Sequence, residues 1–203
     1  MFPFDVILFD VGGVLLTNGW DHNERAAVLA DFHLDLAEFE ARHLEPYRAW
    51  ESGAISAEAY LNATVFYEPR SFTPAEFFAA ICARSKPLPD GALRILQELA
   101  ASDKCLLGAL NNESRETNEY RFSRFGLRNC FRVALTSCYL GLRKPELAMY
   151  QRALDILSRP AERILFIDDR PENVAAAVAA GMKGIRFEGA EALRRELARL
   201  GVL

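Results

Sequence analysis

The sequence predicts an α/β fold, a doubly wound parallel sheet that carries an inserted α-helical subdomain. Short apolar runs alternate with stretches of helical periodicity along most of the chain. The apolar runs are continuous rather than alternating, which is typical of parallel strands covered by helices on both faces. A long helical stretch also separates the first apolar run from the second, so the insertion belongs directly after the first strand.

Five apolar runs are the candidate strands. They are VILFD (6–10), CLLGAL (105–110), RVALTS (132–137), RILFID (163–168) and KGIRF (183–187). Helical patterns occupy 90–102, 114–125, 146–157, 171–180 and 190–200. Pro171 suits the first turn of a helix and Gly181 suits its end, which supports the fourth of these helices.

The residues from about 22 to 84 read as amphipathic helices. One apolar stripe at helical spacing consists of Leu36, Phe39, His43/Leu44, Tyr47 and Trp50. We expect this stripe to be the core of the inserted subdomain rather than a cofactor-binding surface. Thr73, Pro74 and Glu76 have the pattern of an N-cap, a first-turn proline and a capping-box acid. The predicted boundaries are therefore 17–86 for the helical subdomain, with 1–16 and 87–203 forming the sheet domain.

Composition narrows the class of protein. The chain has 203 residues, 51% apolar and 26% charged, as expected for a globular domain with a buried core. A net charge of −4 without a basic stripe argues against a nucleic-acid partner. The N-terminal residues lack a basic leader, and the least polar stretch, VAAAVAAGM at 174–182, is too short to span a membrane. Four cysteines without CxxC spacing indicate free thiols, and hence a cytoplasmic protein.

Polar clusters follow the predicted strands. They are Asp10 with Gly12–Gly13, Asn111–Asn112, Lys144 within LRKPE, and Asp168–Asp169 within FIDDRPEN. Each cluster alone is consistent with a helix cap or a solvated loop. Because ligands of doubly wound sheets bind at the carboxyl ends of the strands, the four together predict one site.

The residue types indicate the chemistry of that site. Three carboxylates (Asp10, Asp168 and Asp169) repel one another unless a cation compensates them, and oxygen ligands suit Mg²⁺. Lys144 adds a positive charge for an anionic group, and the glycines after Asp10 allow backbone N–H groups to approach that anion closely. A carboxylate nucleophile with these partners predicts phosphoryl transfer through an aspartyl-phosphate.

At these residues the sequence resembles the haloacid dehalogenase-like superfamily. FDVGGVL, LNN, LRKPE and FIDDRPEN occur in the family's order over the whole chain, and the insertion resembles its C1-type helical cap. ESGAIS, YLGLRKPE and IDDRPENV are similar to a narrower branch. That branch contains bacterial sugar-phosphate phosphatases of the glucose-1-phosphate type and the N-terminal phosphatase domain of soluble epoxide hydrolase. The resemblance implies an Mg²⁺-dependent phosphatase of a small phosphorylated metabolite.

The resemblance also implies roles for individual residues. Asp10 would be the nucleophile, Lys144 would bridge it to the phosphate, and Asp169 would bind Mg²⁺, with Asp168 as a ligand or beside it. Mg²⁺ would also contact Asp10 and the backbone carbonyl of Gly12. Contacts to the substrate would come from Val11, Gly12, Asn111, Asn112 and Lys144. Asn173 would either steady the acidic loop or have a structural role on its helix.

Two positions depart from the family pattern. Asn111 stands where Ser or Thr is usual, and its amide can still donate to a phosphate oxygen. Gly12 stands where an Asp usually acts as general acid and base, a contribution of about 10²–10⁴-fold. An acidic leaving group, metal-bound water, or an acid from TNGWDHNE (Asp21, His22 or Glu24) are three ways to compensate. A plain helix start, capped by Asn18 or Asp21, is the simpler interpretation of that segment.

Two other functions remain open at this stage. A 2-haloacid dehalogenase would use the same aspartate without metal, although the adjacent acids at 168–169 would disfavour its carboxylate substrate. A non-catalytic phospholigand-binding protein is the other alternative, because Gly12 and Asn111 both depart from the pattern. The retention of Asp10, Lys144 and both acids favours the enzyme.

Overall fold

A parallel sheet forms the centre of the molecule in a computed structural model that describes residues 2–203. Within these residues the sheet has five strands in the order β3-β2-β1-β4-β5. The strands are β1 (Val6–Phe9), β2 (Leu106–Asn111), β3 (Val133–Thr136), β4 (Ile164–Asp168) and β5 (Lys183–Arg186). All the strand pairs are parallel, which confirms the predicted fold class and the five strands.

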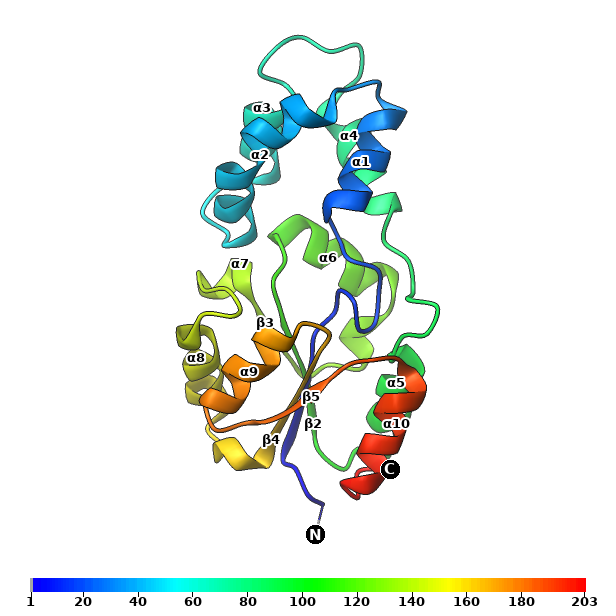
Figure 1. The fold of residues 1–203 in the computed structure, drawn as a ribbon, viewed down its shortest axis with the longest axis vertical. Coiled ribbons are helices and arrows are strands. Elements are labelled where there is room, and N and C mark those ends of the chain that lie inside the picture. Colours follow the sequence, from blue (N-terminus) through cyan, green and yellow to red (C-terminus); the bar gives the residue numbers. More distant parts are fainter. Residues whose placement is uncertain (1) are drawn as a thin grey trace.

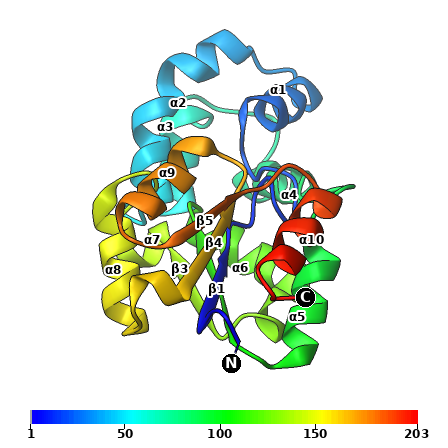
Figure 2. The same cartoon turned by 60° about the horizontal axis from the view of Figure 1, so that its bottom comes forward.

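Helices cover both faces of the sheet, as the continuous apolar strands predict (Figures 1 and 2). One face packs against α5 (Leu93–Ser102), α6 (Arg115–Arg124) and α10 (Ala190–Arg199). The other face packs against α8 (Leu147–Leu157) and α9 (Pro171–Ala179). All five helices lie within two residues of their predicted ends except α5, which begins at Leu93 rather than at 90.

The third predicted strand ends one residue early. Ser137 begins a short helix, α7 (Ser137–Leu140), instead of ending β3. Its hydroxyl donates to the carbonyl of Glu51 at 2.6 Å and accepts from the backbone N–H of Glu113 at 2.9 Å. These contacts draw the chain out of the sheet. Two short 3₁₀ turns, η1 (Leu127–Asn129) and η2 (Ala161–Arg163), were also not predicted.

Four helices form a separate bundle above the sheet. They are α1 (His22–Asp31), α2 (Leu36–Glu51), α3 (Ala57–Thr64) and α4 (Pro74–Ala83), and α4 begins with the predicted capping box. The bundle has its own apolar core, in which Trp20 donates to the Tyr60 hydroxyl at 2.7 Å. Of the predicted stripe, Phe39, His43 and Trp50 are buried, and Leu36 and Tyr47 pack against this core, whereas Leu44 is exposed.

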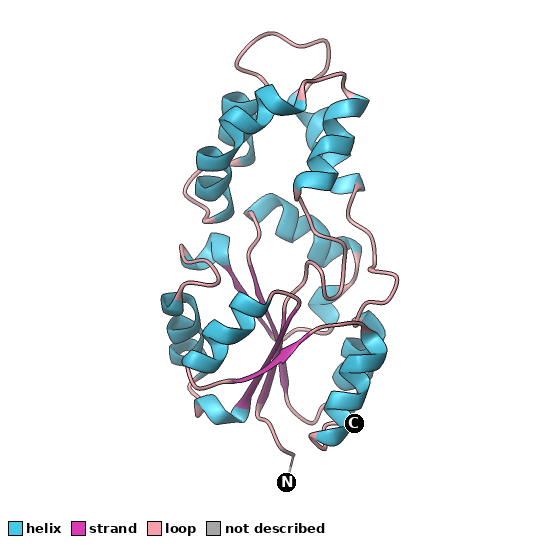
Figure 3. Ribbon diagram, viewed as in Figure 1, coloured by secondary structure: helices cyan, strands magenta, loops and turns pink. Residues whose placement is uncertain are grey.

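The bundle enters and leaves the sheet domain at one place. Leu16 and Pro87 form a β-bridge, and the backbone N–H of Thr17 donates to the carbonyl of Lys86 at 2.8 Å. The two connecting segments therefore run side by side, and the bundle lies over the carboxyl ends of the strands (Figure 3).

Glu116 on α6 fastens the far side of the bundle to the sheet domain. Its carboxylate accepts from the indole N–H of Trp50 at 2.9 Å and from the backbone N–H of Ala57 at 3.0 Å. Trp50 is fully buried, so Glu116 is the partner that its N–H group needs.

The structure also describes the cysteines and the lengths of the helices. The four cysteines are all free, as predicted. Within residues 2–203, no helix combines the length and the apolar character that a membrane span requires.

Replacing Glu116 by alanine should destabilise the protein by about 1–3 kcal/mol, because it leaves the buried Trp50 N–H without an acceptor. Urea denaturation followed by tryptophan fluorescence measures this change. Glu119→Ala on the exposed side of the same helix is the matched control and should stay within about 0.5 kcal/mol of the wild type. Equal stability of the two variants would contradict the proposed role of Glu116 in fastening the bundle.

Candidate active site

The register of the sheet brings Asp10 and Asp168 together. Phe9 of β1 pairs with Ile167 of β4, and the Asp10 N–H donates to the Ile167 carbonyl at 2.8 Å. The next residues on the two strands are the two aspartates. They stand where the strand order reverses, with β2 and β3 on one side of β1 and β4 and β5 on the other. Ligand crevices of doubly wound sheets lie at this point.

Lys144 bridges these carboxylates. Its Nζ lies 2.9 Å from Asp10 Oδ1 and 2.6 Å from Asp168 Oδ2. All three side chains are buried, Asp168 completely. Burial opposes the charge of Lys144, but the two carboxylates outweigh it and raise its pKa. Lys144 is therefore a fixed cation in the site.

The same burial acts on the acids. Burial raises the pKa of Asp10 to about 7, because the lowering effect of Lys144 is smaller and the Asp168 charge adds to the rise. Burial and then the charge of Asp168 also raise the pKa of Asp169. One ammonium thus leaves the group of carboxylates short of positive charge.

Asp168 is held from the α9 side as well. Its Oδ1 accepts from the backbone N–H of Arg170 at 2.9 Å and from the Asn173 amide at 2.9 Å, and that amide lies 3.0 Å from Oδ2. Of the two interpretations of Asn173, the contact to the acidic loop is the one present in the structure. Asp168 therefore has a full set of hydrogen-bond partners.

Asp169 has a carboxylate oxygen that is free to bind a further group. Its Oδ1 is buried and has no hydrogen-bond partner within residues 2–203. Oxygens of Asp10, Asp168 and Asp169 all lie within 4.8 Å of one another. A buried carboxylate oxygen without a partner is costly, and a hard divalent cation would satisfy it and the shortage of positive charge together. The donor set, which contains only oxygen, therefore fits Mg²⁺.

The turn after β1 lies beneath this cluster. Val11 is buried, and its backbone N–H donates to Asp10 Oδ1 at 2.8 Å, which orients the carboxylate. Gly12 lines the pocket. Gly13 has a φ of +73°, and a Cβ on it would lie 2.4 Å from Asp169 Oδ2. The absence of a side chain at position 13 is what allows Asp169 to lie over the turn.

The two asparagines have different surroundings. Asn112 lines the pocket and clamps the backbone of Lys144, donating to its carbonyl and accepting from its N–H, both at 2.9 Å. Asn111 is buried behind it, where its amide donates to Asn118 at 3.2 Å and accepts from Thr136 at 2.9 Å. The expectation that the Asn111 side chain faces the substrate does not agree with this arrangement, because β3 and α6 take up both ends of the amide.

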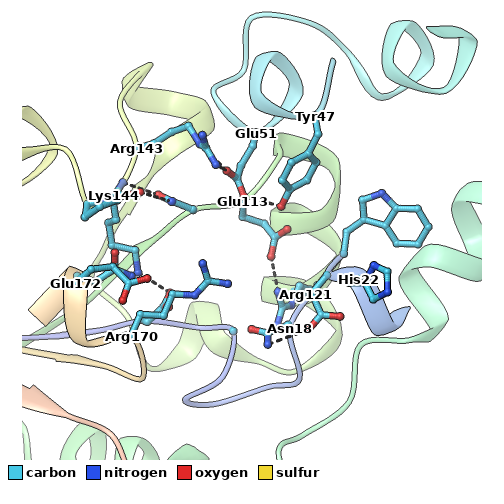
Figure 4. Close-up of a pocket in the computed structure, with 18 of the residues that line it drawn as sticks. Asn18, His22, Tyr47, Glu51, Glu113, Arg121, Arg143, Lys144, Arg170 and Glu172 are labelled. Carbon is cyan, nitrogen blue, oxygen red and sulfur yellow. Dashed lines mark hydrogen bonds and ion pairs between the residues drawn. The ribbon is translucent and has the colours of Figure 1, made fainter. Parts of the chain in front are cut away.

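A pocket of about 260 Å³ opens from the cluster toward the bundle (Figure 4). Its lining is dominated by charged groups from both parts of the chain. The arginines are Arg25, Arg121, Arg143 and Arg170, and the acids besides Asp10 are Asp21, Glu51, Glu113 and Glu172. Glu51 of the bundle pairs with Arg143 and accepts from the Tyr47 hydroxyl at 2.7 Å. The bundle thus forms the roof of the pocket.

The segment that enters the bundle contributes to the rim. Asp21 lines the pocket and caps α1, accepting from the backbone N–H of Asn23 at 2.8 Å, so the simpler interpretation as a helix start is confirmed. His22 also lines the pocket but is two-thirds exposed and lies beside Glu40. Burial and then a hydrogen bond to Asp21 raise the pKa of Glu24 to about 7.

Sequence reasoning did not find Asn18 as a lining residue, nor the buried pair of Glu113 and Arg121. Both members of the pair belong to the segment that follows LNN, and a helical pattern with charges normally indicates a solvated face. The signal that was available is position, since Glu113 directly follows one of the strand-end clusters.

Two relatives match nearly the whole chain. The chloroplastic flavin mononucleotide hydrolase 1 of Arabidopsis thaliana is 29% identical over 198 residues, which cover 97% of this chain and 78% of that protein. A sesquiterpene phosphatase of Aspergillus oryzae is 27% identical over 202 residues, which cover 97% of this chain and 96% of that protein.

The fold is also similar to solved structures. A haloacid dehalogenase (HAD) family enzyme of Bacteroides thetaiotaomicron, crystallised with magnesium and inorganic phosphate, superposes with a TM-score of 0.76. It is 17% identical, and the match covers 92% of this chain and 95% of that one. The sequence profile of the family described as haloacid dehalogenase-like hydrolase matches residues 4–181, and the chain therefore belongs to that family.

Proposed function

We propose that this hydrolase is an Mg²⁺-dependent phosphatase that acts on a small, polar phosphorylated metabolite through an aspartyl-phosphate on Asp10. One observation carries the proposal: Asp10, Asp168 and Asp169 converge at the carboxyl ends of β1 and β4, with Lys144 between two of them. Phosphoryl transfer requires a nucleophile and a concentration of positive charge in one place.

The named relatives support this reaction class. One is named a flavin mononucleotide hydrolase and another a sesquiterpene phosphatase, and both names describe the removal of phosphate. The structural relative from Bacteroides thetaiotaomicron carries magnesium and inorganic phosphate. A phosphoric monoester hydrolase is thus the activity that agrees with both the relatives and the residues.

In the proposed reaction the Asp10 carboxylate attacks phosphorus, and the bond from phosphorus to the leaving oxygen breaks. Lys144 favours the ionised form of Asp10 and is close enough to pair with a phosphoryl oxygen at the same time. Asn112 keeps Lys144 in place through its backbone. The N–H of Val11 orients the attacking carboxylate.

Asp10, Asp169 and the backbone carbonyl of Gly12 would hold the metal, with Asp168 as a further ligand or as the group that fixes Lys144. Bound there, Mg²⁺ would neutralise part of the charge on the phosphoryl oxygens. The partnerless Oδ1 of Asp169 supports this ligand role.

The pocket supports a small and polar substrate. Its volume of about 260 Å³ lies below the about 300–1,000 Å³ of sites for drug-sized ligands. Its charged lining gives little surface for an apolar terpene chain or a flavin ring. We infer a sugar phosphate, in particular a hexose 1-phosphate, in agreement with the branch that ESGAIS, YLGLRKPE and IDDRPENV resemble.

A 2-haloacid dehalogenase is the second candidate, because the family includes both chemistries. Such a substrate carries its own carboxylate. Three neighbouring acids with one ammonium would repel it without a cation, which disfavours this candidate.

We also propose that residues 17–86 act as a cap on a core formed by 1–16 and 87–203. The pairing of Thr17 with Lys86, where both connecting segments meet, supports these boundaries. A cytoplasmic location stays a prediction.

Purified protein should release phosphate from phosphate monoesters, hexose 1-phosphates included, in the presence of Mg²⁺. The release should vanish with EDTA and return when Mg²⁺ is added in excess, because the carboxylate cluster needs a cation. Asp10→Asn should abolish turnover, since an amide cannot attack phosphorus. Phosphate release by malachite green is the measurement, and the fold of the variant is checked by circular dichroism.

A parallel panel of 2-haloacids separates the alternatives. Halide release that is unaffected by EDTA would overturn the phosphatase in favour of the dehalogenase. No turnover of either panel, with Asp10→Asn binding phosphate as the wild type does, would favour a phospholigand-binding protein.

Gly13→Ala should lower turnover by about 10²-fold, because its Cβ would displace the Asp169 carboxylate by an ångström or so. Gly201→Ala is the matched control. Gly201 has a similar φ of +72° with no atom within 4 Å of the added Cβ, so it imposes the backbone strain without touching the site. Full activity of Gly13→Ala would show that the position of Asp169 does not matter.

A further inference from the structure

The space beside Gly12, where the family's usual acid would stand, is not empty. A Cβ on Gly12 would lie 3.1 Å from Asn18 Oδ1 and 3.9 Å from Arg121 Nη1. The Asn18 amide oxygen is therefore tight against this position, and the Arg121 guanidinium borders the volume into which a longer side chain at position 12 would extend. Both residues line the pocket (Figure 4).

Arg121 is held firmly in this place. It is only 2% exposed, pairs with the buried Glu113 and donates from Nη2 to the Thr17 carbonyl at 2.6 Å. Its Nε is buried and has no hydrogen-bond partner within residues 2–203. A guanidinium carries five N–H donors, so Arg121, which lines the pocket, has donors that no protein group in the described part of the chain uses.

The surrounding contacts keep Asn18 against Gly12. Its amide nitrogen donates to Asp21 Oδ2 at 3.2 Å, which turns its oxygen toward the glycine. Asp21 is fixed in turn as the N-cap of α1. The arginine and the asparagine therefore form a built arrangement rather than two side chains that happen to fill a gap.

We propose that Arg121 stabilises the departing oxygen of the substrate, in place of the proton donor that Gly12 lacks. The inference rests on the proposed phosphatase reaction and identifies a residue that would contact the leaving group. A guanidinium does not give up its proton in proteins and so cannot act as the acid, and its contribution is a positive charge and hydrogen bonds.

A carboxylate oxygen of Asp10 forms a bond to phosphorus, and the electron pair of the breaking P–O bond stays on the leaving oxygen. Arg121 donates a hydrogen bond to that oxyanion and keeps its proton, and the oxyanion takes a proton from solvent water. Water then attacks phosphorus of the aspartyl-phosphate, which releases phosphate, restores the carboxylate and returns a proton to solvent.

This arrangement favours particular substrates. Without protonation, the rate depends more steeply on how well the leaving oxygen bears negative charge. The anomeric oxygen of a sugar 1-phosphate and the carboxylate released from an acyl phosphate bear it better than the oxygen of a simple alcohol. The substrate class inferred from the pocket and the one inferred from Arg121 therefore agree.

Two aryl phosphates of similar shape test the proposal. p-Nitrophenyl phosphate has an acidic leaving group, whereas phenyl phosphate has a much less acidic one. Arg121→Met should lower kcat for phenyl phosphate by about 10²-fold, as the loss of an oxyanion donor does, and that for p-nitrophenyl phosphate by less than about tenfold. Arg121→Lys, which keeps the charge, should recover a large part of the rate on phenyl phosphate.

A double variant distinguishes the loss of Arg121 from the damage caused by leaving Glu113 buried without its partner. Glu113→Gln/Arg121→Met removes both members of the buried pair and leaves no unpaired carboxylate behind. Arg128→Met, which alters an exposed arginine that follows α6, is the matched control and should change neither rate.

The possible outcomes are distinct. An equal fold-loss on both aryl phosphates in the single and the paired variant would make Arg121 a structural residue and overturn the inference while the phosphatase stands. Failure of the wild type to release phosphate from these compounds and from the panel of phosphate monoesters, or release that persists in Asp10→Asn, would overturn the proposed function and the inference together.

Discussion

The ammonium group of Lys144 is the interaction on which the rest of the site depends. It lies between carboxylates at the ends of two adjacent strands, and without it two buried charges of the same sign would face each other. The sheet register makes the meeting unavoidable, because Phe9 pairs with Ile167 and an aspartate follows each. The loop that carries Lys144 is fixed in turn by the Asn112 amide, which bonds its backbone on both sides.

The same loop joins the site to the bundle. Arg143, the residue before Lys144, pairs with Glu51 at the end of α2, and Ser137 on α7 donates to the Glu51 carbonyl. The end of α2 is thus held by the residue next to Lys144 and by the start of α7. The end of α2 and the backbone next to Lys144 are therefore directly connected through the pair of Glu51 and Arg143.

The sequence predicts most of this architecture because the fold follows from local patterns. Continuous apolar runs locate the strands, and the charges at their ends locate Asp10, Asp168 and Asp169, since parallel strands end at a common edge. Lys144 was predicted at a strand end as well, but it lies in the loop that follows α7. Asn111 shows the limit of such reasoning. Its position at a strand end is correct, but which way the amide turns depends on Thr136 and Asn118, two partners that only the folded chain brings near.

The sequence pattern did not identify Arg121 as a site residue, for a related reason. It lies on a strongly polar helix, and its burial arises because Glu113 and the Thr17 carbonyl meet it from two other segments. No periodic pattern in the sequence predicts these contacts between distant segments. Tyr47 shows a related effect, because helical spacing correctly assigns its ring to the core of the bundle but does not indicate that it also lines the pocket, where its hydroxyl bonds Glu51.

These contacts also bear on whether Gly12 marks a site in decay. Buried charges that lack full compensation reduce stability, so a chain without use for them has a physical reason to lose them. Here the ammonium of Lys144 and the guanidinium of Arg121 both line the pocket, and the partnerless oxygen of Asp169 belongs to the carboxylate cluster of Asp10. A site that had merely lost its acid would leave a void or water beside Gly12, whereas the Asn18 amide lies against that position and the Arg121 guanidinium borders it. Gly12 is therefore better understood as the room that Asn18 and Arg121 require than as a missing part.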